Sequence, residues 1–183
     1  MNRSYTLTEG KCEARLIKYL KDEYDIPFGK IIKKNVVTTS VNKLISFHKA
    51  YTQSKQTWTI YLIFDCDIFT RNELNVDDVI NKVKKLNKIA NVSRIICLIQ
   101  HCFEDEMCEI IGFKKKDLYN LFNAEGKNEF TANFINSNNT KISNMFEINT
   151  HAIYYLWTNE QKHINILKRN GILVSNFKML SEE

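Results

Sequence analysis

Apolar residues along the first two thirds of the chain follow two different spacings that alternate. Short apolar runs, nearly continuous, are typical of strands covered on both faces, and apolar residues at every third or fourth position are typical of amphipathic helices. The runs predict strands over residues 5–8, 31–38, 58–64 and 92–99. The periodic stretches predict helices over residues 12–24, 40–53, 75–90 and 103–111.

This order of strand then helix, repeated along the chain, predicts an α/β fold. Such alternation implies a Rossmann-like, mostly parallel sheet with helices on both faces. After Gly112 the pattern changes, and it predicts short helices over 114–122 and 129–136, a polar loop over 138–143 and one or two helices over 149–167. We therefore expect an α/β domain over residues 1–112 and a helical extension over 113–183 that packs on it.

Composition narrows the class of protein. With 44% hydrophobic and 26% charged residues, the 183-residue chain is typical of one globular domain. Only five glycines and one proline are present, too few for the many tight turns of an all-β sandwich. The five cysteines form no Cys-x-x-Cys pair, which favours a reducing cytoplasm over a disulfide framework. We expect a cytoplasmic protein without a membrane span, because no apolar run is long enough.

Acidic residues follow three of the four predicted strands. Glu9 follows the first, Asp65 and Asp67 follow the third, and Glu104 lies a few residues beyond the fourth. Sites in parallel sheets form at the carboxyl ends of strands, and a strand period of two would point Asp65 and Asp67 to one side. Carboxylates without a nearby His or Cys ligand set favour Mg²⁺ or Mn²⁺ over Zn²⁺. The sequence therefore predicts a divalent-metal site, although each acid alone also fits a helix cap or a solvated loop.

Three further residues are weaker candidates for a functional role. Glu13 is one turn into the first predicted helix, where it either supports the metal ligands from behind or faces solvent. His101 follows the fourth predicted strand, and His48 lies on the apolar face of the second predicted helix. We expect both histidines to be structural rather than catalytic.

The basic residues are relevant to whether the protein binds nucleic acid. A net charge of +5 is compatible with nucleic-acid binding without requiring it. Two basic runs are candidate phosphate contacts if the acids act on nucleic acid, and are otherwise solvated surface. These candidates are Lys33 and Lys34 in the first run and Lys114, Lys115 and Lys116 in the second.

The order of the acidic motifs along the chain resembles that of a known protein family. A strand, then Glu9-Gly10-x-x-Glu13 opening a helix, then a later hydrophobic strand ending in Asp65-x-Asp67, resembles the Toprim domain. This is the catalytic module shared by topoisomerases, bacterial primases and overcoming-lysogenization-defect nucleases. Within the family the chain is most similar to small stand-alone bacterial proteins of the RloB type, in which a Phe-Glu pair follows the fourth strand. The resemblance covers residues 5–111.

The resemblance implies a Mg²⁺- or Mn²⁺-dependent nuclease that cleaves phosphodiester bonds, such as an effector of bacterial defence against phage. It implies that Glu9 is a general acid/base and that Asp65 and Asp67 hold the catalytic metal. Glu104 would add to the metal site. The substrate would be a nucleic acid.

Two other functions are compatible with the same residues. A non-catalytic Toprim-like subunit would use the carboxy-terminal helices to bind a partner protein or a second copy of the chain. A flavodoxin-like regulatory domain would also gather acids around Mg²⁺ at the strand ends. It would need a lysine after its last strand, and the sequence offers none in a convincing place.

Overall fold

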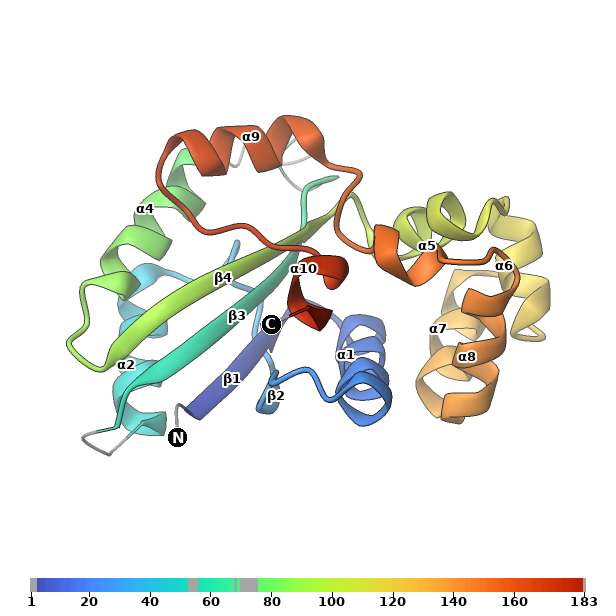
Figure 1. Cartoon of the computed structure of the whole chain (residues 1–183), viewed down its shortest axis with the longest axis horizontal. Coiled ribbons are helices and arrows are strands. Elements are labelled where there is room, and N and C mark those ends of the chain that lie inside the picture. The colour runs from blue at the N-terminus through green and yellow to red at the C-terminus, as the bar shows by residue number, and fades with distance from the viewer. Residues whose placement is uncertain (1–2, 53–55, 68, 70–75, 183) are drawn as a thin grey trace.

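The structure is a computed structural model, and it describes residues 3–52, 56–67, 69 and 76–182. Its centre is a four-stranded sheet in which every strand pair is parallel, with helices on both faces (Figure 1). In chain order the strands are β1 (Arg3–Thr8), β2 (Lys30–Lys33), β3 (Trp58–Asp65) and β4 (Val92–Gln100), and their order in the sheet is β2-β1-β3-β4. The predicted α/β, Rossmann-like fold class is confirmed.

Helices make up most of the rest of the described chain. Those that cover the sheet or precede its strands are α1 (Lys11–Tyr24), α2 (Val41–Tyr51) and α4 (Val76–Asn87). The helices that follow β4 are α5 (Phe103–Ile111), α6 (Lys115–Leu121), α7 (Lys127–Asn136), α8 (Asn139–Glu147), the 3-10 helix η1 (Ala152–Tyr155), α9 (Gln161–Arg169) and α10 (Phe177–Ser181). Residues 53 and 75, at the ends of two predicted helices, lie outside the described residues.

The sheet separates two hydrophobic cores, and β3 contributes to both. Every β3 residue before Asp65 is buried, as its continuous apolar run predicts. Ile60, Leu62 and Phe64 belong to the core shared with α2 and α4, while Tyr61 and Ile63 belong to the core shared with α1 and α5. This alternation decides which core each side chain after Phe64 will face.

The predicted second strand is too long. The pattern predicts residues 31–38, but β2 ends at Lys33. The side-chain oxygen of Asn35 accepts hydrogen bonds from the backbone N–H groups of Val37 at 2.8 Å and Thr38 at 3.0 Å. This Asx-type turn bends the chain away from the sheet, so Val36 and Val37 are buried without extending the strand.

The predicted polar loop over 138–143 is wrong, because α8 occupies most of it. Asn138 caps the helix by accepting a hydrogen bond from the N–H of Lys141 at 2.9 Å. Ile142, Met145 and Phe146 are the buried residues of α8. Their helical spacing begins inside the polar stretch and continues past it, which is why the stretch alone is misleading.

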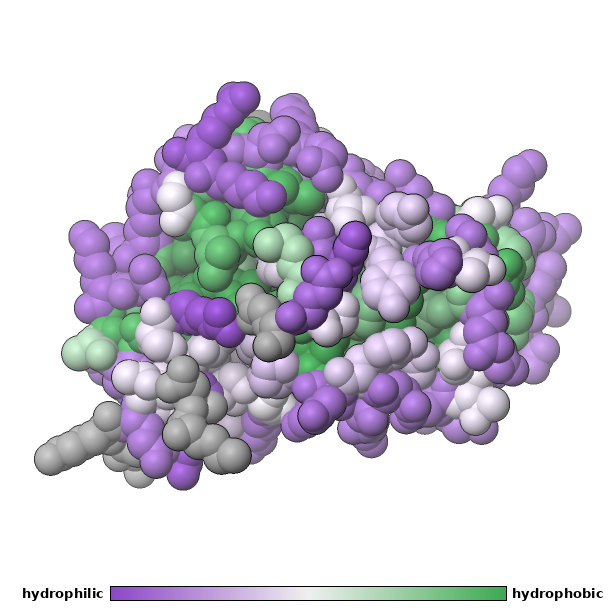
Figure 2. All heavy atoms as spheres, viewed as in Figure 1, coloured by the Kyte–Doolittle hydropathy of each residue, from purple (hydrophilic) through white to green (hydrophobic). Residues whose placement is uncertain are grey.

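The carboxy-terminal part returns to the sheet after α9. The N–H of Cys97 donates to the carbonyl of Leu173 at 2.9 Å, and the N–H of Ser175 donates to the carbonyl of Cys97 at 3.1 Å. Figure 2 shows hydrophobic atoms at the surface between α9 and the strands, with hydrophilic residues around them. Helices α7 and α8 share a core with α1. The division of the chain at residue 112 stays a prediction.

Among the described residues, no helix combines the length and the apolar character that crossing a membrane requires.

The loop before β2 approaches β1 so closely that Gly29 has no room for a side chain. Gly29 has φ +65°, and a Cβ there would lie 1.9 Å from the carbonyl oxygen of Ser4. We expect Gly29→Ala to lower the free energy of unfolding by at least about 2 kcal/mol, because β1 must move. Gly112→Ala is the matched control, since Gly112 has φ +75° with open space around it. Urea denaturation measures the free energy of unfolding of both variants. An equal loss in Gly29→Ala and Gly112→Ala would contradict the close approach of Gly29 to β1.

Candidate functional site

The carboxyl ends of β1, β3 and β4 lie at one edge of the sheet. Alternation along each strand decides which side chains at this edge face α1. Ile63 and Leu98 both belong to the core shared with α1. Two residues further along their strands, Asp65 and Gln100 are register partners and continue on that side. The first acid of the Asp-x-Asp motif therefore faces the amino-terminal end of α1.

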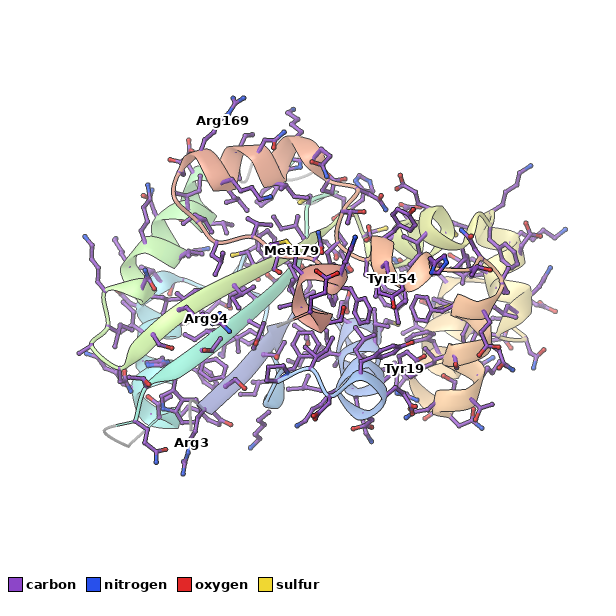
Figure 3. All side chains as sticks on the ribbon, in the orientation of Figure 1. Arg3, Tyr19, Arg94, Tyr154, Arg169 and Met179 are labelled. Atoms are coloured by element: carbon purple, nitrogen blue, oxygen red, sulfur yellow. The ribbon has the colours of Figure 1, made fainter. Side chains whose placement is uncertain are left out.

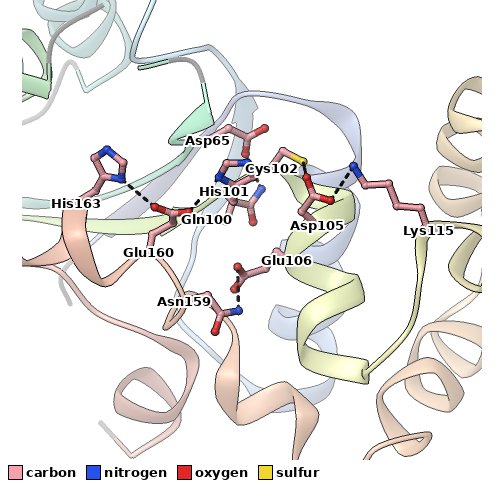
Figure 4. A network of polar contacts seen from close by, with 10 residues as sticks. All are labelled: Asp65, Gln100, His101, Cys102, Asp105, Glu106, Lys115, Asn159, Glu160 and His163. Atoms are coloured by element: carbon pink, nitrogen blue, oxygen red, sulfur yellow. Dashed lines mark hydrogen bonds and ion pairs between the residues drawn. The ribbon is translucent and has the colours of Figure 1, made fainter. Parts of the chain in front are cut away.

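A buried glutamine joins the acids at this edge. Gln100 Nε2 donates to Asp65 Oδ1 at 2.8 Å (Figure 4) and to Glu13 Oε1 at 3.4 Å. The backbone N–H of Asp65 lies 3.5 Å from Glu9 Oε2, which accepts from it. Glu9, Glu13 and Asp65 thus belong to one hydrogen-bonded group, although they come from the β1–α1 turn, α1 and β3.

Gly10 lets Glu13 fold back over the start of α1. Gly10 caps this helix in an extended conformation, with Glu13 in its first turn. A Cβ at Gly10 would lie 2.4 Å from Glu13 Oε2, so any other residue would push the carboxylate away. The Glu-Gly-x-x-Glu motif therefore has a steric reason for its glycine. The amino-terminal end of the helix also attracts negative charge.

The acids at this edge raise one another's pKa values. Burial, followed by the charge of Glu13, raises the pKa of Asp65 to about 8. Burial raises the pKa of Glu13, and the charges of Glu9 and Glu104 add to that rise. Burial also raises the pKa of Glu9, to which the charge of Asp67 contributes. The predicted acids therefore lie close enough to repel one another, and a divalent cation would relieve that repulsion.

Two buried oxygen atoms in this group lack a hydrogen-bond partner. They are Glu13 Oε2 and Gln100 Oε1, and Glu13 is only 5% exposed. Buried polar atoms are nearly always satisfied, so these two oxygens, beside several carboxylates, could serve as ligands for a cation or its water. All the donors here are oxygens, which suit Mg²⁺ or Mn²⁺. The residues present fit the predicted metal.

Asp67 reaches this edge in a different way from the one expected. β3 ends at Asp65, and Asp67 already has helical backbone, so the strand period does not apply to it. Its N–H donates to the carbonyl of His101 at 3.1 Å, and the N–H of Cys66 donates to the carbonyl of Gln100 at 2.8 Å. Strand alternation therefore sets the direction of Asp65 but not that of Asp67.

Glu104 lies at the margin of the acidic group and already has a cationic neighbour. It is buried in the first turn of α5. Lys127 Nζ lies 3.1 Å from Glu104 Oε1 and 3.2 Å from Glu104 Oε2. The sequence analysis did not single out Lys127, because its partner is brought to it only by the packing of α7.

The predicted lysines flank the acids from two elements. Lys33 ends β2 opposite Thr8, and the N–H of Lys34 donates to the carbonyl of Thr8 at 2.9 Å, so the backbone of both stands next to Glu9. The Lys34 ammonium itself lies over the ring of Phe47 on α2, 5.0 Å from its centroid. Lys115 Nζ forms an ion pair with Asp105 Oδ1 at 2.7 Å, beside Glu104 on α5. The remaining two, Lys114 and Lys116, are exposed.

Sequence reasoning missed a second group at the same edge. Across the described ranges, one set of three metal-ligating side chains has donor atoms within 4.8 Å of one another, and it consists of Cys66, Glu160 and His163. The predicted acids do not form such a set. The Glu-x-x-His spacing of Glu160 and His163 puts both residues on one side of a helix, and it is the sequence feature that could have indicated this group. His101, expected to be structural, is exposed and lies 3.1 Å from Glu160.

His48 behaves as expected of a structural histidine. It is fully buried, and its ring nitrogens lie 2.9 Å from the Tyr5 hydroxyl and 2.9 Å from Asn91 Oδ1. This position is at the amino edge of the sheet, where the N–H of Trp58 donates to the carbonyl of Asn91. His48 therefore takes no part in the candidate site.

Comparison of the chain with protein-family models, with curated proteins and with solved structures finds no match. The Toprim resemblance and the roles that follow from it accordingly stay predictions.

Without a divalent metal, the free energy of unfolding should fall as pH rises from about 4 to 8, by about 2 kcal/mol or more. Burial raises the pKa of the Asp65 carboxyl from 3.8 in the unfolded chain to about 8 in the folded chain, so between these values only the folded chain holds the proton. That stability is complete below the lower value and is lost as pH passes the upper one.

Asp65→Asn should flatten this pH dependence and be more stable than the wild type at pH 8. Denaturant unfolding in the presence of a chelator measures both effects. Glu125→Gln, which removes a charge from the exposed surface, should keep the wild-type slope. An unchanged slope in Asp65→Asn would contradict the assignment of this pH dependence to Asp65.

Proposed function

We propose that the chain is a divalent-metal-dependent nuclease of the Toprim type that cleaves nucleic-acid phosphodiester bonds, acting in the bacterial cytoplasm in defence against phage. The observation that carries the proposal is the convergence of Glu9, Glu13 and Asp65 around Gln100, with two buried oxygens unpaired. A structural role alone would not require several partly or fully buried carboxylates that repel one another.

Asp65, Asp67 and Glu9 would hold Mg²⁺ or Mn²⁺, with Glu104 at the margin and Glu13 supporting them from behind. The bound ion would polarise a phosphoryl oxygen and lower the pKa of a bound water. Burial already raises the pKa of Glu9, so its carboxyl can hold and release a proton closer to neutral pH than an exposed glutamate. The N–H of Asp65 positions that carboxyl.

The lysines beside the acids would hold the nucleic acid through its phosphates. Lys33 and Lys34 stand next to the carboxyl end of β1. Lys114, Lys115 and Lys116, at the start of α6, stand next to α5. Phosphate contacts position a substrate without selecting its sequence. This arrangement is compatible with cleavage of either DNA or RNA.

A second candidate function is a non-catalytic Toprim-like subunit that binds a partner protein or a second copy. Exposed aromatic side chains on the carboxy-terminal part favour it. Tyr155 is 57% exposed, and Tyr154, labelled in Figure 3, and Tyr24 both pack beside Phe177 while remaining exposed. Such an aromatic surface suits a protein interface.

Glu9→Gln and Asp65→Asn should each lower metal-dependent cleavage by roughly 100-fold or more, because each removes a group that acts on the reacting phosphate or its metal. The assay is cleavage of labelled single-stranded and duplex RNA and DNA with Mg²⁺ or Mn²⁺. Circular dichroism checks that the variants are folded. Glu125→Gln is the control and should keep full activity.

Calorimetric titration with Mn²⁺ separates the two candidate functions. The nuclease requires a saturable site that Asp65→Asn weakens. A folded wild-type chain that binds no Mn²⁺ and cleaves nothing would favour the non-catalytic subunit. Cleavage retained in both Glu9→Gln and Asp65→Asn would contradict the assignment of these residues.

Replacing Lys33 and Lys34 together by Ala should weaken nucleic-acid binding and make it less dependent on salt. The slope of log K against log salt should fall by about 1 for each lysine that contacts a phosphate. Lys49→Ala is the matched control, because α2 ends at the opposite edge of the sheet, where Asn91 contacts Thr52. Fluorescence anisotropy at several salt concentrations measures the affinity and its salt dependence. A slope in the double variant equal to that of the wild type would exclude the phosphate contacts.

A further inference from the structure

The short loop after β3 presents side chains to both faces of the sheet. Asp65 contacts Gln100 on the α1 side. Cys66, the next residue, belongs to the opposite core, which it shares with Ile164 and Leu167 of α9. The thiol is 1% exposed. The residue between the two acids of the Asp-x-Asp motif therefore points away from the acidic group and toward α9.

Two residues at the start of α9 lie beside this thiol. Glu160 is the N-cap of α9, and His163 follows three residues later on the same side. His163 Nδ1 lies 2.8 Å from Glu160 Oε2, and His101 Nδ1 lies 3.1 Å from Glu160 Oε1 (Figure 4). Cys66, Glu160 and His163 each place one donor atom within 4.8 Å of the other two. The set thus joins the ends of β3 and β4 to the start of α9.

We propose that Cys66, Glu160 and His163 bind a transition-metal ion of the Zn²⁺ class. Sulfur, nitrogen and carboxylate oxygen are the donors that Zn²⁺ takes in proteins, whereas Mg²⁺ prefers oxygen alone. His101, whose Nδ1 lies against Glu160 Oε1, would orient that carboxylate from outside the set of three donors. This site is separate from the acidic group that contains Asp65, and the proposal does not depend on the nuclease function.

Binding follows the ordinary chemistry of a thiol ligand. The Cys66 S–H bond breaks, its proton goes to solvent, and a sulfur–metal bond forms. The imidazole of His163 binds in its neutral form. No oxidant or reductant is needed, because Zn²⁺ does not change its oxidation state.

The ion would fasten α9 to the loop that carries the acids. Cys66 lies between Asp65 and Asp67, and its N–H already donates to the carbonyl of Gln100. Ile164 and Leu167 are the buried residues that α9 contributes to the core. A metal at its first turn would hold the start of α9, just ahead of Ile164, against the loop after β3.

The test is a titration of the metal-free full chain with Co²⁺, a spectroscopic substitute for Zn²⁺. We expect a thiolate-to-cobalt absorption band that saturates at a stoichiometric amount of Co²⁺ and disappears when Zn²⁺ is added. Cys66→Ser should abolish the band. His163→Gln and Glu160→Gln should each weaken Co²⁺ binding by about 10-fold or more.

Two controls separate this site from other cysteines and from the acidic group. Cys108→Ser removes a buried thiol outside the set, and Asp65→Asn alters the proposed Mg²⁺ site. Both should keep the band, whatever the outcome of the cleavage assays. If Cys66→Ser does not fold, His163→Gln decides, because its side chain is partly exposed. The proposal would be overturned if the thiolate-to-cobalt band were absent, or if it survived Cys66→Ser. It would also be overturned if His163→Gln and Glu160→Gln both kept the wild-type affinity for Co²⁺.

Discussion

Everything at the candidate site depends on the pairing of β3 between β1 and β4. Because all three strands are parallel, their carboxyl ends reach the same edge, and because both faces of β3 are covered, its side chains must alternate strictly between two cores. A shift of one residue would send Asp65 into the core with α4 and Cys66 toward α1. The register therefore decides which acid meets Glu13 and which residue meets α9.

The fold places several carboxylates where burial disfavours their charge. Gln100 and the amino-terminal end of α1 offset part of that penalty, yet Glu13 Oε2 stays without a partner. Raised pKa values at Glu9, Glu13 and Asp65 have the same origin, since each is partly or fully buried near other acids. A group of this kind is stabilised at neutral pH when it takes up protons or a cation.

The errors of the sequence analysis came from interactions between residues that the patterns treat separately. Asn35 ended β2 early by accepting two backbone hydrogen bonds, and Asn138 began α8 inside a stretch that looked like a loop. Period-two alternation explains the direction of Asp65 but does not apply to Asp67, because the strand stops between them. At Asn35 a local turn overrode a periodic signal, and at Asn138 a cap started a helix that the polar composition hid.

By itself the sequence determined the α/β class, the extent of β3 and the gathering of Glu9 and Asp65 at one edge. These follow from local hydrophobic spacing and from the rule that parallel strands end together. Only the tertiary structure decided that Gln100 links the acids, that Lys127 meets Glu104, and that Cys66 lies beside α9. The physical reason is that these contacts join elements far apart in the chain, and their geometry depends on how helices pack rather than on any local period.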